Sequence, residues 1–349
     1  MSHLTVGMSD DWFKKEGMTR TPEQWEDGTR VDNKPGRFEW WYFDAHMDDG
    51  STVVAVIYTK PHGSINIPCT PQVKLIITGP DGKAQLNVDN FKSSDFHASS
   101  EKCDVQVGPN KISGDLKKYN IHFEVGGNSA DLEFRRIVPS WRPGVGKCYF
   151  GKELHHYLGW FVPVPYGKVS GTIRYDNKDH KVTGAGYHDH NYGNRALPKI
   201  IDNWYWGRLK IADYNCIFFQ FVAAKKYGHE KLPLFMFARG EEIIIQDGSK
   251  LKVVEKNFIT HSSGKSYPAN LEFIWEDGDN AIAIRLLNPQ LIESRYLLAE
   301  LPLYKRIIAR LFLNPYYFRF TADIEMEINY KNIKDIKKEK GIFESMMLR

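Results

Sequence analysis

Two stretches of the chain, residues 184–193 and 203–208, concentrate the side chains that could do chemistry. They read Gly-Ala-Gly-Tyr-His-Asp-His-Asn-Tyr-Gly and Asn-Trp-Tyr-Trp-Gly-Arg, so three Tyr, two Trp, two His and one Asp fall close together. Rings that exclude water strengthen an acid or a hydrogen bond relative to bulk solvent. The stretches therefore indicate an aromatic-walled cavity with a positioned proton donor. The ordinary alternative is a buried Asp that caps a turn, with the aromatics filling a β-core.

The first stretch, read as a strand, presents two different faces. Side chains alternate along a strand, so Tyr187, Asp189 and Asn191 would share one face, and His188 and His190 the other. The glycines around this segment are typical of bulges or close backbone approach. We predict that Asp189 is the catalytic group and that Tyr187, His188 and Asn191 position it.

Four further residues are candidates for the pocket walls. Trp204 and Trp206 share one face of the second stretch, and they would lie on the same side as Asp189 if the two strands pair. Glu39 and Trp41 alternate together on another aromatic strand, where Trp41 would line the pocket and Glu39 would be a partner in the cavity. The alternative for Glu39 is a barrel-end carboxylate bonded to a Trp N–H or to an Arg.

A proton donor at position 189 needs a pKa well above the ordinary aspartate value of about 3.9. Burial among Tyr187, Tyr192, Trp204 and Trp206 would raise that pKa, because desolvation disfavours the carboxylate. The same ring faces could stabilise a carbocation formed when an alkene is protonated. This combination suits the addition of a proton to a C=C bond.

Other chemistries have weaker support in the residues. His188 and His190 would share a strand face, but a metal would need a further ligand, and nothing ties His155 or His156 to that face. The sequence has no Gly-x-Ser-x-Gly elbow, no Cys beside a His in the cluster, and no phosphate-binding or dinucleotide glycine motif. We therefore expect neither a metal nor a redox cofactor.

The composition is that of an ordinary globular protein. The 349 residues are 42% hydrophobic and 26% charged, with a slight net charge of +4 and no dense basic face for nucleic acid. The four cysteines are scattered and predict reduced, mostly buried thiols. A polar N-terminus without an apolar signal region, and no run long enough to span a membrane, favour a cytoplasmic protein.

Short strands and turns fill the chain, with almost no helical periodicity, which favours an all-β protein built as a sandwich or barrel. We predict an irregular N-terminal arm at 1–36, two β domains at 37–197 and 198–331, and a charged tail at 332–349. Residues 139–149 are expected to form a loop, and one strand is expected to end at Pro163.

One segment, residues 303–312, has helical spacing of apolar residues with basic residues on the other side. It would be a lid over a barrel mouth, a plug at one barrel end, or a peripheral contact with a membrane.

Three motifs together resemble a known family: Glu39-Trp-Trp-Tyr-Phe43, the Tyr-His-Asp-His-Asn segment that begins at Tyr187, and Trp204-Tyr-Trp-Gly207. The chain is similar, from about residue 38 to 330, to the two-domain lipocalin-like proteins that include carotenoid 1,2-hydratases of the hydroxyneurosporene synthase type and AttH-like proteins. Decalin-forming Diels–Alderases and kievitone hydratase belong to the same broad group.

The resemblance implies two packed lipocalin-like β domains, a hydrophobic pocket within or between them, and no redox cofactor. In the hydratases an Asp in a Tyr-x-Asp setting is the proposed proton donor, which corresponds to Tyr187 and Asp189 here. An upstream His and Trp of the hydratases have His156 and Trp160 as their nearest counterparts. The family pattern Asn-Trp-Gly is Asn191-Tyr192-Gly in this chain.

The expected function is therefore a cofactor-independent hydratase or cyclase that acts on a long, apolar, unsaturated small molecule in secondary metabolism. It would either donate a proton to a C=C bond or fold a polyene for a pericyclic (Diels–Alder) cyclisation. The alternative is a non-catalytic lipocalin-like carrier of a lipid or pigment. The residues do not decide between these reactions, and they do not name the substrate.

Overall fold

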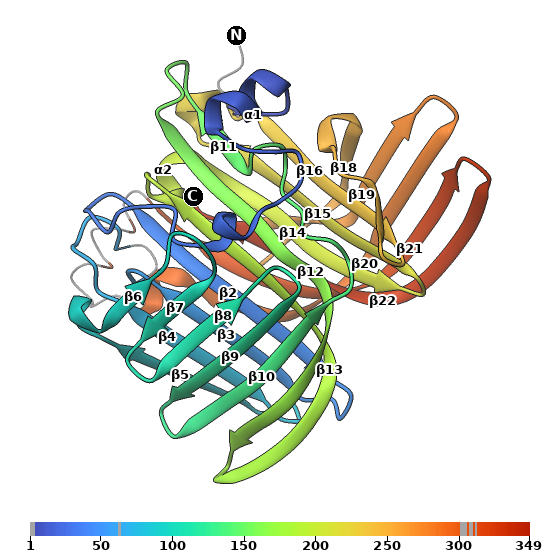
Figure 1. Ribbon diagram of the computed structural model, residues 1–349. Helices are drawn as coiled ribbons and strands as arrows, with labels where there is room; N and C mark the ends of the chain where they lie inside the picture. Colours follow the sequence, from blue (N-terminus) through green and yellow to red (C-terminus); the bar gives the residue numbers. More distant parts are fainter. Residues whose placement is uncertain (1–3, 62–63, 301–305, 307–309, 311–312) are drawn as a thin grey trace. The chain divides into compact units, whose positions relative to one another are not determined.

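The protein is all-β and forms two compact units, Thr5–Ala196 and Leu197–Arg349 (Figure 1). Each unit contains an antiparallel sheet and its own apolar core. The predicted fold class is confirmed. The computed structural model describes residues 4–61, 64–300, 306, 310 and 313–349.

The N-terminal unit is a half-barrel whose sheet has the strand order β5-β4-β3-β2-β13-β12-β10-β9-β8-β7-β6, with β1 and β11 joined beside β12. β13 thus lies between β2 and β12, as Figure 1 shows for the long yellow-green strand. The elements up to residue 196 are β1 (Leu4–Val6), α1 (Asp10–Glu16), η1 (Gln24–Asp27), β2 (Phe38–Met47), β3 (Thr52–Tyr58), β4 (Gln72–Thr78), β5 (Ala84–Asn90), η2 (Ser93–Asp95), β6 (Phe96–Ala98), β7 (Asp104–Val107), β8 (Asn110–Gly114), β9 (Lys118–Val125), β10 (Asn128–Arg136), β11 (Lys147–Phe150), β12 (His156–Tyr175) and β13 (Lys178–Gly193).

Alternation of apolar and polar residues explains which face of this sheet is buried. In β9, Tyr119, Ile121, Phe123 and Val125 are buried and the residues between them are not, which is the period of two expected of a half-buried strand. The inward side chains of the other strands join them in a single apolar cluster. The core therefore lies on the concave face of the half-barrel.

The strand expected to end at Pro163 continues through it to Tyr175. β12 pairs with β13 on both sides of this proline, and the register shifts between Phe161 and Val164 and again between Val164 and Gly167. A proline cannot donate to the ladder, so a bulge at this point lets the strand bend without losing its pairing. The adjoining segment 139–149 is not wholly a loop, because Trp141 bridges Val162 and β11 begins within it.

The C-terminal unit has the strand order β17-β16-β15-β14-β22-β21-β20-β19-β18. Its inward residues, such as Phe218, Phe273 and Phe320, form a second aromatic-rich core. The elements are α2 (Leu197–Ile200), β14 (Ile201–Ile211), β15 (Tyr214–Ala223), η3 (Lys225–Tyr227), β16 (Lys231–Arg239), β17 (Glu242–Ile245), η4 (Gly248–Lys250), β18 (Leu251–Thr260), β19 (Ser266–Asp277), β20 (Asn280–Tyr296), η5 (Leu297–Glu300), β21 (Tyr316–Tyr330) and β22 (Ile333–Met347).

Two terminal segments differ from what the sequence predicts. The region expected to be a charged tail is β22, which pairs with β21 from Ile333 to Met347. Its charged side chains are exposed or half-exposed and its backbone pairs with β21 along its whole length, so high charge is compatible with a strand here. The arm expected to be irregular contains α1 and η1, and η1 carries a buried carboxylate described below.

The amphipathic segment at 303–312 lies outside the described residues apart from Arg306 and Arg310, so its role stays a prediction. Within the described part of the chain, no helix has the length and apolar character needed to cross a membrane. The four cysteines are free and buried, as the sequence predicts.

Candidate active site

The alternation predicted for β13 is confirmed, and it gathers three of the candidate residues on one face. The Tyr187 hydroxyl donates to Oδ2 of Asp189 at 2.8 Å, and the Asn191 amide donates to Oδ1 at 2.8 Å. Residues two apart on a strand project to the same side, so the sequence places both donors beside the carboxyl group without any contribution from distant loops.

Trp160 completes this group from the neighbouring strand β12. It lies opposite Asn191 in the register, and its indole Nε1 donates to Oδ2 of Asp189 at 3.0 Å. Its ring packs edge-on against Trp141, with ring centroids 5.2 Å apart. The carboxyl group of Asp189 therefore accepts hydrogen bonds from an indole, a phenol and an amide, all of them uncharged.

Asp189 is 8% exposed, and burial raises its pKa to about 6. The hydrogen bonds from Trp160 and Tyr187 act in the opposite direction, because they stabilise the carboxylate. A group with this pKa keeps a proton on about a tenth of molecules at pH 7 and gives it up readily. That is the range in which a carboxyl group can act as a general acid.

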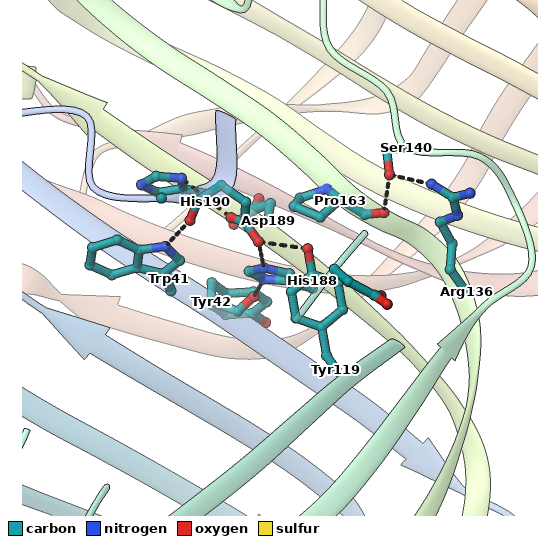
Figure 2. Close-up of polar contacts among 12 residues, drawn as sticks. Trp41, Tyr42, Tyr119, Arg136, Ser140, Pro163, His188, Asp189 and His190 are labelled. Carbon is teal, nitrogen blue, oxygen red and sulfur yellow. Dashed lines mark hydrogen bonds and ion pairs between the residues drawn. The ribbon is translucent and has the colours of Figure 1, made fainter. Parts of the chain in front are cut away.

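The opposite face of β13 is also polar but is organised differently. His188 places Nδ1 2.9 Å from the Tyr42 carbonyl oxygen and Nε2 3.0 Å from Oδ2 of Asp27 (Figure 2). His190 places Nε2 2.9 Å from Oε1 of Glu39 and Nδ1 3.4 Å from Oδ1 of Asp27. The expectation that His188 contacts and orients Asp189 is not met, because consecutive strand residues point to opposite faces.

Asp27, the last residue of η1, is the centre of this second cluster. Its side chain is fully buried; it accepts a hydrogen bond from the Tyr119 hydroxyl at 2.6 Å, and its backbone carbonyl accepts one from Trp41 Nε1 at 3.0 Å. Burial alone would raise the pKa of Asp27, but His188 and His190 lower it well below its usual range. Conversely, burial opposes the charge of His190, while Asp27 and Glu39 together raise its pKa to about 9.

Glu39 and Trp41 lie on this histidine face, away from Asp189. Glu39 accepts hydrogen bonds from the Thr29 hydroxyl and the Arg30 backbone N–H, both at 2.6 Å, in addition to its contact with His190. Trp41 is completely buried and stacks on the His190 ring at 4.6 Å. Their assignment as walls of a pocket beside Asp189 is therefore corrected: they are parts of the core.

The remaining candidates separate further. Tyr192 points to the histidine face as well, with its ring 5.4 Å from that of His190. Trp204 and Trp206 belong to β14 of the other unit, which pairs with β15 and β22 rather than with β13. The two motif strands do not pair, since both edges of β13 are occupied by β2 and β12, so the condition for placing Trp204 and Trp206 beside Asp189 is not met.

The model of the Svf1 family matches residues 24–345. This chain belongs to the Svf1 family. Among curated relatives, it is 26% identical over 210 residues to hydroxyneurosporene dehydrogenase of Chlorobaculum tepidum, covering 50% of this chain and 54% of that protein. It is 27% identical over 150 residues to acyclic carotenoid 1,2-hydratase of Rhodobacter capsulatus, covering 42% and 50%. The chain thus spans about half the length of these curated relatives.

Solved structures support the lipocalin-like architecture of this Svf1-family chain. CghA bound to Sch210972 has a TM-score of 0.60 at 12% identity and 99% coverage of both chains. Kievitone hydratase of Nectria haematococca has a TM-score of 0.55 at 14% identity, covering 94% of this chain and 98% of that one. An AttH protein of Nitrosomonas europaea has a TM-score of 0.58 at 14% identity, covering 89% and 92%. At such identities the likeness establishes the fold, and it confirms the resemblance inferred from the motifs.

One group of side chains in the described part of the chain has the spacing of a metal site: Asp27, Cys103 and His188, whose ligand atoms lie within 4.8 Å of one another. The donor chemistry does not suit a metal. Burial and the nearby Asp27 charge raise the pKa of the Cys103 thiol well above its ordinary value, so the thiolate that metals bind is disfavoured. Asp27 already accepts hydrogen bonds from its neighbours. We assign this cluster to the hydrogen-bonded core.

Residues of the N-terminal unit line a cavity and a groove, and Asp189 lines neither of these two. A cavity of about 100 Å³ is lined by Tyr192, Phe161 and charged residues that include the buried pair Arg142 and Glu26. A wider groove of about 550 Å³ runs between residues 29–33 and strand β6. The apolar hollow expected beside Asp189 is not one of these two.

Proposed function

We propose that this chain is a cofactor-independent enzyme that adds water to, or cyclises, an apolar unsaturated small molecule, with Asp189 as the proton donor. The observation that carries the proposal is a buried carboxyl group with a pKa raised to about 6, held by three uncharged donors. A relative whose name is acyclic carotenoid 1,2-hydratase supports the substrate class.

The donors indicate which oxygen of Asp189 carries the proton. An indole N–H only donates, so Oδ2, which accepts from Trp160 and Tyr187, remains an acceptor. The acidic hydrogen therefore belongs on Oδ1. Asn191 Nδ2 also donates to Oδ1, which keeps a lone pair for this bond when it carries the proton.

The reaction begins when Oδ1 transfers this proton to one carbon of a C=C bond, leaving a carbocation on the other carbon. All three donors then stabilise the carboxylate that forms, so the charge that develops on Asp189 meets groups that are already oriented. In a hydration, water adds to the cation and loses a proton to a base. In a cyclisation, another double bond of the substrate adds to the cation, and the new cation loses a proton to a base. Neither outcome needs a redox cofactor.

The test compares the wild type, Asp189→Asn and Asp48→Asn with an acyclic carotenoid in oxygen-18-labelled water, using mass spectrometry of the product. Asp189→Asn should lower hydration by about 10²- to 10⁴-fold, the usual contribution of a general acid. Asp48 is exposed in the turn between β2 and β3, so its substitution removes an equal charge and should leave the rate unchanged. A full rate in Asp189→Asn would exclude the acid role, and tight binding without turnover in the wild type would favour a carrier.

A further inference from the structure

A second buried carboxyl group, that of Asp44, lies on the same face as Asp189. In the pairing of β13 with β2, Asp189 is opposite Tyr42 and Tyr187 is opposite Asp44. Residues directly opposite one another project to the same side of a sheet, so Asp44 joins Tyr187 and Asp189. Diagonal neighbours of this kind are about 7–8 Å apart, and their side chains can interact. The intervening residues Phe43 and His188 lie together on the opposite face, where their rings stack with centroids 3.8 Å apart.

Both carboxyl groups are withdrawn from water. Asp44 is 6% exposed and Asp189 is 8% exposed. The neighbours of Asp189 on this face are the uncharged Trp160, Tyr187 and Asn191, and the charge of Asp44 raises the pKa of Asp189. His188 acts on Asp189 from behind the strand and lowers that pKa. Asp44 is therefore the acidic neighbour that favours a proton on Asp189.

We propose that Asp44 is the general base of the site, which receives a proton from the water that adds to the substrate. The inference rests on the proposed function of Asp189 as the acid. An acid and a base that act on opposite steps of water addition must face the same substrate, with room for a water molecule between them. The register makes Asp44 and Asp189 diagonal neighbours on one face of the sheet, so both carboxyl groups lie on the same side.

The step balances without an added reactant. Asp189 gives its proton to one alkene carbon, and the oxygen of water forms a bond to the other carbon. The proton that this water loses goes to the Asp44 carboxylate, so the product has gained one molecule of water. Asp189 is then a carboxylate and Asp44 an acid, and return of one proton from Asp44 to Asp189 restores the starting state.

This role excludes a pericyclic cyclisation, because that reaction releases no proton for a base to accept. It also requires opposite starting states for the two acids, with Asp189 protonated and Asp44 ionised. The charge of Asp44 favours the proton on Asp189, because like charges in a dry site oppose one another.

The experiment uses the full chain and compares Asp44→Asn, Asp44→Glu and Asp48→Asn. One readout is hydration of an acyclic carotenoid in oxygen-18-labelled water, and the other is the infrared band of a protonated carboxyl group that Asp189→Asn abolishes, followed against pH. Asp44→Asn should lower hydration by about 10²-fold or more and move the midpoint of the Asp189 band to lower pH. Asp44→Glu should keep the midpoint near that of the wild type and restore part of the rate, and Asp48→Asn should change neither.

The outcomes separate this proposal from the one on which it rests. A wild-type rate and an unchanged Asp189 midpoint in Asp44→Asn would overturn the role of Asp44. If Asp189→Asn is inactive in the same experiment, the proposed function of Asp189 as the acid still stands. A full rate in Asp189→Asn would overturn the proposed function itself. If the wild type does not hydrate the carotenoid, the role of Asp44 as a base is rejected. A shifted Asp189 midpoint in Asp44→Asn would then still show that the charge of Asp44 acts on Asp189, and an unshifted midpoint would reject that effect as well.

Discussion

The two faces of β13 each bury an acidic group, yet they treat its charge in opposite ways. Asp189 on one face has uncharged donors, and its pKa is raised to about 6. Asp27, packed against the other face, lies between two histidines, and its pKa is lowered. Burial penalises a carboxylate in both places. The difference shows that the charge of the partner, rather than the degree of burial, decides whether a buried acid is ionised.

The comparison also assigns different tasks to the two faces. A group that stays ionised between two histidines holds η1, β2, β9 and β13 together, because each contributes a partner to the cluster. A group whose pKa lies near neutrality can instead exchange its proton within a reaction cycle. The histidine face is therefore the support, and the Asp189 face is the part that can do chemistry.

The largest effect on stability is expected from Asp27→Asn, which tests whether the histidine face supports the fold. The substitution leaves two buried histidines facing a neutral amide, and removing one partner of a buried ionic contact costs about 3–5 kcal/mol. Denaturant unfolding at pH 7 measures the loss. The control is Asp10→Asn, whose ion pair with Arg20 is largely exposed and should contribute less than about 1 kcal/mol. Equal effects of the two substitutions would contradict the supporting role of the histidine face.

A pH titration of stability tests the same face without a mutation. The pKa of His190 is raised from 6.5 to about 9, so its protonated form is favoured by folding. The contribution is fully present below about pH 6.5 and is lost as the pH rises through about 9, with an order of magnitude of about 3 kcal/mol. Unfolding free energies measured between these pH values should fall. In Glu39→Gln the fall should end at lower pH and be smaller, because one of the two charges that raise the folded pKa of His190 is gone.

Substitution of the buried acid on the Asp189 face should change stability in the opposite direction to Asp27→Asn. The folded pKa of Asp189, about 6, exceeds the ordinary value of 3.8, so the ionised side chain destabilises the fold above about pH 6 and has no such effect below about pH 3.8. Asp189→Asn removes that charge and should increase the unfolding free energy at pH 8 by about 1–2 kcal/mol, after the loss of charge-assisted hydrogen bonds is included. At pH 4 the gain should disappear. A large loss of stability at pH 8 would mean that Asp189 is held as a structural carboxylate.

The sequence predicts the β13 face because that information is local. Alternation alone places Tyr187 and Asn191 beside Asp189, and no tertiary contact is needed to infer it. Asp27 could not be found in this way, since its partner His188 is 161 positions away and the segment that carries it is polar and without periodicity. The local sequence around Asp27 offers only a Trp-Glu-Asp run at the end of a short helical turn as a sign that this carboxyl group is buried.

The absence of pairing between β13 and β14 also has a physical cause. Strands that follow one another in sequence usually pair, which favours a hairpin of the two motifs. Here α2 separates them at the point where the chain passes from one unit to the other, and β14 takes β22 from the C-terminal end as its second neighbour. Composition shows that Trp204 and Asp189 are chemically suited to one another, but it carries no information on which strand completes which sheet.

The smallest expected effect comes from Trp160→Phe, which sharpens the comparison at a single hydrogen bond. The phenyl ring keeps most of the packing against Trp141 but removes the donor to Oδ2 of Asp189. Since that donor stabilises the carboxylate, its loss should raise the pKa of Asp189 further and cost about 1 kcal/mol of stability. The infrared band of the protonated acid measures the first effect and denaturant unfolding the second. Tyr149→Phe removes a buried phenol that donates to Glu16 instead, so it should leave the Asp189 midpoint where it is. An unchanged midpoint in Trp160→Phe would show that the indole donor does not set the acidity of this group.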